Sequence, residues 1–86
     1  MTVMTATKTI TVLYFAALRE LAGRQEQLVE TSALTSVELY NQLRHEHGFT
    51  WESDQLSVAI NDAFSDWTEP LADGDRVAFL TPVAGG

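Results

Sequence analysis

The sequence predicts an α+β fold, in which a mixed β-sheet packs on one main helix and a short extra helix. Segments rich in β-branched and aromatic residues are interrupted by segments of helical periodicity, and this order predicts both element types. A single amphipathic helix must bury its apolar stripe against one face of a sheet. The chain has 86 residues, enough for one small hydrophobic core.

The first half of the chain begins with a strand and a short helix. A strand is expected over 10–15, where apolar side chains occupy both alternating positions, as in a central strand covered on both faces. Residues 16–22 change to helical spacing, and Gly23 is a typical helix terminator. Weak alternation in a polar context predicts an edge strand over 25–30.

The main helix follows. Thr35 and Glu38 fit a capping box, in which the threonine caps the helix and the glutamate occupies its third position. Apolar residues recur at helical spacing until Gly48, which is expected to end the helix. Residues 50–55 are polar and predict a loop.

The second half of the chain predicts three further strands, over 57–61, 64–67 and 76–80, separated by turn residues such as Asn61-Asp62 and Asp73-Gly74-Asp75. The apolar first and last strands are expected to be neighbours in the centre of the sheet. A β-grasp, ubiquitin-like architecture satisfies this order. The expected division is a flexible leader over 1–8, the domain over 9–81 and an extended tail over 82–86.

Composition excludes several classes of function. Five Lys+Arg against twelve Asp+Glu give a net charge of −7, which disfavours nucleic acids and anionic membranes but suits a basic protein partner. The chain has no cysteine, so it has no disulfide, no thiolate metal site and no cysteine nucleophile. No apolar run approaches the ~20 residues of a membrane span, and no signal peptide is recognisable. We therefore expect a cytoplasmic protein.

Metal and cofactor motifs are also missing from the sequence. His45 and His47 are two residues apart, so on a helix their rings point in different directions, and we expect them at a solvated helix end. Asp73-Gly74-Asp75 resembles a fragment of a calcium loop but lacks the flanking ligands. No glycine-rich phosphate loop is present. We expect no bound metal and no bound cofactor.

The C-terminus is the most informative segment. It ends in a Gly-Gly pair that lacks Cβ atoms and can thread a narrow tunnel, which makes the terminal carboxylate an accessible acyl group. The tail can extend roughly 17 Å beyond the sheet, at ~3.3–3.6 Å per residue. A free carboxylate is a poor electrophile, but adenylation by a partner would supply a good leaving group, and sulfur could then be added. The tail residues are Pro82, Val83, Ala84, Gly85 and the reactive Gly86.

The chain resembles the small subunits of molybdopterin synthase, the MoaD family of ubiquitin-like sulfur carriers. The resemblance lies in a segment with the pattern FxxxREL-G at 12–23, the stretch 58–61, and the segment from 70 to the terminal VAGG at 86. The family tail usually begins with two prolines, and Thr81 replaces the first of them here.

This resemblance implies a role for the terminus. An adenylyltransferase of the ubiquitin-activating type would use ATP to adenylate Gly86, which would become a thiocarboxylate, a C-terminal 1-thioglycine. The tail would enter the large subunit of molybdopterin synthase and pass its sulfur to cyclic pyranopterin monophosphate, forming half of a dithiolene. Two small and two large subunits would form a heterotetramer, with the acid–base groups in the large subunit.

The family pattern also implies an apolar docking patch on Phe15, Phe64 and Leu80, with Arg19 pairing with an acidic group of the partner. Core packing is the alternative for Phe15 and Phe64, and a solvated helix face is the alternative for Arg19. Leu80 has the opposite parity to Phe79, but the sequence does not decide which parity faces the helix.

Other functions remain open at this stage. A related sulfur carrier for thiamin thiazole or another thiolation pathway would share the Gly-Gly end. A ubiquitin-like binding module with an inert Gly-Gly end belongs to a different class, and a free-standing enzyme is disfavoured by the missing nucleophile and cofactor motifs.

Overall fold

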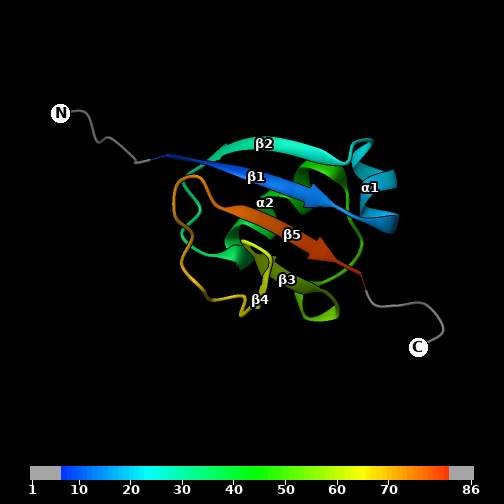
Figure 1. The fold of residues 1–86 in the computed structure, drawn as a ribbon. Helices are drawn as coiled ribbons and strands as arrows, with labels where there is room; N and C mark the ends of the chain where they lie inside the picture. The colour runs from blue at the N-terminus through cyan, green and yellow to red at the C-terminus, as the bar shows by residue number, and fades with distance from the viewer. Residues whose placement is uncertain (1–6, 82–86) are drawn as a thin grey trace.

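The centre of the fold is a pair of parallel strands, β1 (Lys8–Tyr14) and β5 (Arg76–Leu80), in a computed structural model that describes residues 7–81 (Figure 1). They are the neighbours expected from the sequence. Their apolar side chains alternate, so that Val12 and Phe79 are fully buried and point to the same side of the sheet.

The other strands complete a five-stranded mixed sheet of order β2-β1-β5-β3-β4. β2 (Glu26–Thr31) pairs antiparallel with β1 and forms one edge, as predicted. β3 (Ser57–Ile60) pairs antiparallel with β5, and β4 (Ala63–Ser65) is the opposite edge. Together with the helix described below, this topology is the β-grasp fold predicted from the sequence.

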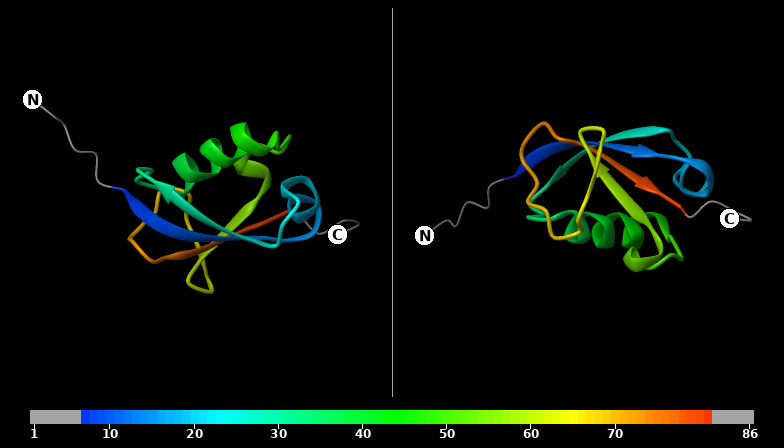
Figure 2. Two further views of the ribbon diagram at one scale, coloured as in Figure 1. Left: turned by 90° about the horizontal axis from the view of Figure 1, so that it is seen from above. Right: turned by 60° about the horizontal axis from the view of Figure 1, so that its bottom comes forward.

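One face of the sheet is covered by α2 (Ser36–His47), and in the described residues neither helix covers the opposite face (Figure 2). The Oγ1 atom of Thr35 accepts a hydrogen bond from the Glu38 N–H at 3.5 Å, as a capping threonine should. The Glu38 carboxylate accepts from the Leu34 N–H at 3.5 Å instead of completing the expected capping box.

Two glycines end the helices where the sequence predicts. α1 (Ala16–Ala22) ends at Gly23 with φ 74°, and α2 ends at Gly48 with φ 73°. Both glycines adopt the left-handed conformation that residues with a Cβ seldom tolerate. α1 lies beside the end of β5 in all views (Figures 1 and 2).

The core lies between α2 and the sheet, and aromatic side chains form its centre. The ring centroid of Phe79 lies 5.2 Å from that of Tyr40 and 5.7 Å from that of Trp67, which stacks on Phe79 with an interplanar angle of 5°. The Tyr40 hydroxyl donates a hydrogen bond to the carbonyl of Trp51 at 2.7 Å. This bond satisfies the polar end of a fully buried ring.

A second aromatic group closes the core at the end of α2. Tyr14 donates a hydrogen bond to the Oε1 atom of Gln27 at 2.8 Å, and Nε2 of His47 lies 3.0 Å from the same oxygen. Burial raises the pKa of Tyr14 well above its usual 10.0, because the phenolate would lose its hydration. The half-buried His47 ring packs against Tyr14 and Phe49, contrary to the expected solvated helix end, whereas His45 is exposed.

Most strand boundaries differ from prediction by one or two residues, and the differences that matter most concern β1, β4 and the segment 50–55. β1 begins at Lys8, within the predicted leader over 1–8. β4 ends at Ser65 rather than at 67, because Trp67 turns into the core to stack on Phe79. The predicted loop over 50–55 contains a 3-10 helix, η1 (Ser53–Gln55).

Candidate functional site

The face of the sheet opposite α2 carries an apolar row that crosses four strands. Leu13 of β1 pairs in register with Ala78 of β5, Ala78 pairs with Ala59 of β3, and Ala59 pairs with Phe64 of β4. Side chains in register on one face of a sheet are nearest neighbours. We use the name open face for the surface formed by this row and Leu80, which comprises Leu13, Ala59, Phe64, Ala78 and Leu80.

The open face is accessible to a partner. Phe64 has 77% of its surface exposed, and the other members of the open face are half-buried. In β1, β3 and β5 the residue that follows Leu13, Ala59 or Ala78 points to the side of the sheet that α2 covers, so these three side chains cannot turn inward without a change of strand register. Neighbouring apolar side chains left exposed on a small domain are typical of a protein–protein contact.

Phe15 extends this surface at the end of β1. Tyr14 and Phe79 are paired in register, so Phe15 and Leu80 are the next residues along two parallel strands. Phe15 has an extended backbone and is 42% exposed. Ala16, with φ 51°, then turns the chain into α1, a conformation that alanine rarely adopts. This turn leaves the Phe15 ring outside the core.

Arg19 is exposed on α1, near the end of β5. Within residues 7–81 its guanidinium makes no ion pair. It therefore has the accessibility that the expected contact with an acidic group requires, and also fits the alternative of a solvated helix face.

The strand that carries Leu80 leads directly to the predicted tail. Thr81 is the last described residue, and the tail residues Pro82, Val83, Ala84, Gly85 and Gly86 lie outside the described residues. Of the predicted site, the structure therefore locates Phe15, Arg19, Phe64 and Leu80. Phe15, Arg19 and Leu80 lie at the end of the sheet where β5 ends. Phe64 lies on β4, at the other side of the open face.

Sequence reasoning missed Leu13, Ala59 and Ala78, the members of the row between the predicted residues. The signal for them is that apolar residues occupy both alternating positions of these strands, a pattern that for the strand over 10–15 predicts cover on both faces. In the structure only one parity is fully buried, because α2 covers only one face. The apolar second parity is typical of a sheet that has a partner for its outer face.

The open face offers contact area rather than reactive groups. No group of three or more metal-ligating side chains occurs in the part of the chain that the structure describes. Neither helix within residues 7–81 combines the length and the hydrophobicity that crossing a bilayer would require. The five members of the open face have apolar side chains, so they offer contact area to a protein.

Comparisons with known proteins show which families and folds this chain is similar to. The model of the ThiS family matches residues 12–86. The molybdopterin synthase sulfur carrier subunit of Escherichia coli K12 is 38% identical over 81 residues, covering 90% of this chain and 99% of the relative. The sulfur carrier subunit of Drosophila melanogaster is 34% identical over 79 residues, covering 87% and 88%.

A solved structure has the same fold and was determined with another subunit. It belongs to the complex of subunits 1 and 2 of the molybdopterin-converting factor from Helicobacter pylori 26695. The matched chain superimposes with a TM-score of 0.65 at 26% identity, covering 91% of this chain and 99% of that chain.

Proposed function

The chain belongs to the ThiS family of sulfur carriers, as its resemblance to the MoaD proteins predicts, and we propose that it acts as the sulfur carrier subunit of a molybdopterin synthase. The observation that carries this proposal is the match over nearly the whole chain to curated sulfur carrier subunits, together with the terminal Gly85-Gly86 pair. The body of the domain positions the terminus, and the terminus carries the sulfur.

The chemistry of the terminus proceeds in two steps. An oxygen of the Gly86 carboxylate attacks the α-phosphorus of ATP held by an adenylyltransferase, and pyrophosphate leaves. Hydrosulfide supplied by a separate donor then attacks the acyl carbon, so that a carbon–sulfur bond forms and the bond to the leaving AMP breaks. Loss of the remaining proton from sulfur gives the thiocarboxylate. The chain has no cysteine, so neither step uses a thiol of its own.

The acceptor step takes place on the partner. We propose that the large subunit of molybdopterin synthase binds the open face together with Phe15, while the tail reaches its active site and gives up sulfur to cyclic pyranopterin monophosphate. The exposed Phe64 supports this docking surface, because aromatic side chains are enriched at the centre of protein interfaces, and the half-buried Leu80 adds apolar contact area. Arg19 is proposed to pair with an acidic group at its rim.

Replacing Phe64 with alanine is expected to weaken binding to the large subunit by about tenfold or more, because a central aromatic contact is lost. Leu34→Ala is the matched control: Leu34 is 65% exposed, but it lies in the connection between β2 and α2 and not on the open face. Isothermal titration calorimetry with the large subunit from the same organism measures both dissociation constants.

Equal dissociation constants for the two variants would contradict the docking surface. The variants also need equal melting temperatures, because both side chains are largely exposed and contribute little to the core. A lower melting temperature for Phe64→Ala alone would instead show that Phe64 supports the fold.

A further inference from the structure

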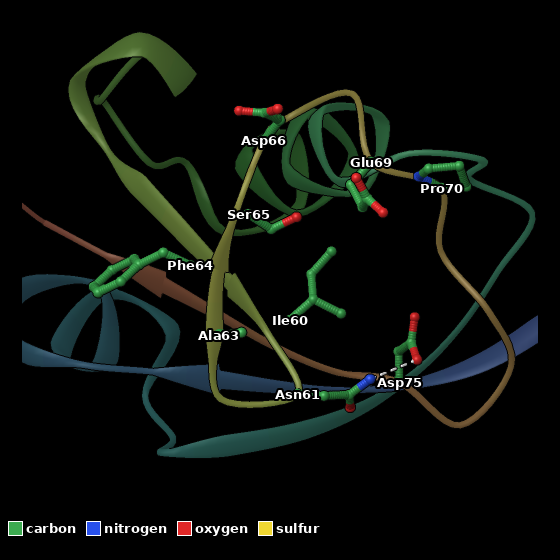
Figure 3. Close-up of a pocket in the computed structure, with 9 residues that line it drawn as sticks. All are labelled: Ile60, Asn61, Ala63, Phe64, Ser65, Asp66, Glu69, Pro70 and Asp75. Atoms are coloured by element: carbon green, nitrogen blue, oxygen red, sulfur yellow. Dashed lines mark hydrogen bonds between the residues drawn. The ribbon is translucent and has the colours of Figure 1, made fainter.

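A groove lies at the edge of the sheet, next to the open face. It runs between the hairpin of β3 and β4 and the connection that leads to β5, and has a volume of about 670 Å³ (Figure 3). Its lining residues are Ile60, Asn61, Ala63, Phe64, Ser65, Asp66, Glu69, Pro70 and Asp75. The half-buried Ile60 side chain projects into the space between the two segments (Figure 3).

The carboxylates of the groove are not equivalent. Asp75 is used by the fold: one oxygen accepts from the Asn61 amide at 2.9 Å and the other from the Ala72 N–H at 2.8 Å. Asp66 and Glu69 are exposed, and within residues 7–81 their carboxylates make neither a hydrogen bond nor an ion pair. The groove therefore has an apolar floor and two carboxylates available for a ligand.

The groove and the open face are two sides of one edge strand. Phe64 is a member of the open face and also lines the groove, and Figure 3 shows its ring directed away from Ile60 and Glu69. β4 has only three residues and no strand beyond it in the described sheet. A protein bound over Phe64 can therefore reach the groove around this edge without displacing any element of the sheet.

We propose that this groove receives a lysine or arginine side chain of the protein that docks on the open face. The aliphatic stem of such a side chain would pack on Ile60, and its charged end would meet the carboxylates of Asp66 and Glu69. A basic residue also complements the net charge of −7 of this chain. The inference rests on the docking proposed above and adds the chemistry of one contact to it.

The test is a charge reversal in the groove. Glu69→Lys is expected to weaken binding to the large subunit roughly tenfold at low ionic strength, because it places a like charge opposite the incoming cation. Asp54→Lys on η1 is the matched control, because Asp54 is also exposed and the substitution raises the net charge of −7 by the same two units. Asp54 lies near the N-terminal end of β3, whereas the groove lies at the C-terminal end of that strand. Isothermal titration calorimetry at about 50 mM and about 300 mM salt measures the dissociation constants of both variants.

The outcomes separate this inference from the proposed function. A loss for Glu69→Lys that exceeds the loss for Asp54→Lys, and that shrinks at high salt, supports a basic side chain in the groove. Equal effects of the two variants, with wild-type binding intact and weakened by Phe64→Ala, would overturn the groove contact alone. Absence of wild-type binding would instead overturn the proposed function. Asp66→Asn, which keeps the side-chain shape, must change binding in the same direction as Glu69→Lys.

Discussion

Replacing Gly86 with alanine is expected to abolish sulfur delivery while the domain stays folded. The proposed tunnel of the partner accepts a terminus without Cβ atoms, and an added methyl group would displace the acyl carbon from the reacting groups. A displacement of about 1 Å costs on the order of 100-fold in rate, so conversion of cyclic pyranopterin monophosphate should fall at least that far. Product formation by the reconstituted synthase measures it, and intact mass shows whether the variant still gains sulfur.

Gly48→Ala is the matched control for this substitution. Gly48 ends α2 with φ 73°, and an added Cβ would meet no atom within 4 Å apart from those of its own chain neighbours. The variant should lose about 1 kcal/mol of stability through backbone strain and keep full sulfur transfer. Full pterin conversion by Gly86→Ala would refute the steric argument.

Deleting Gly85 and Gly86 distinguishes a sulfur carrier from a ubiquitin-like binding module with an inert end. A carrier loses all function with its reactive end, whereas a ubiquitin-like module with an inert end would still bind and work.

Phe79→Ala is expected to have the largest effect on stability. Phe79 is fully buried and contacts Tyr40 and the stacked Trp67. Removing such a ring leaves a cavity and costs about 3–5 kcal/mol, a large share of the about 5–15 kcal/mol that stabilises most domains. Urea unfolding followed by circular dichroism measures the loss.

The neighbouring residue provides the control. Leu80→Ala removes a half-buried side chain on the open face and should cost about 1 kcal/mol. It should also weaken binding to the large subunit, because Leu80 belongs to the docking surface proposed above. Equal destabilisation by the two substitutions would contradict the assignment of the two faces of β5.

The local elements could be predicted because their signals are local. Thr35 caps α2, Gly23 and Gly48 end the helices, and the turns at Asn61-Asp62 and around Gly74 lie where their residue types indicate. Strand pairing in the centre followed from the apolar character of the first and last strands. These features depend on side-chain entropy, capping and φ preferences within a few residues.

The missing parts depend on tertiary contacts. The position of α2 decides which alternate side chains of β1 and β5 are buried. The sequence alone does not decide between the two sets. Trp67 leaves the predicted strand because it stacks on Phe79 of β5, and the half-buried His47 packs against Tyr14 and Gln27, which belong to other strands. The groove at β4 is lined by residues of the β3–β4 hairpin and of the connection to β5, and the periodicity of the sequence does not predict that these segments face each other.

The central claim is that Gly86 carries sulfur, and the mass of the intact protein tests it most directly. The chain is co-produced with the adenylyltransferase of its own organism and a sulfur source, and its mass is compared with that of the chain produced alone. The account predicts a gain equal to the replacement of one oxygen by sulfur, localised to Gly86 by fragmentation. An unchanged terminus, in the presence of an adenylyltransferase that modifies a known carrier, would contradict the account and favour an inert ubiquitin-like module.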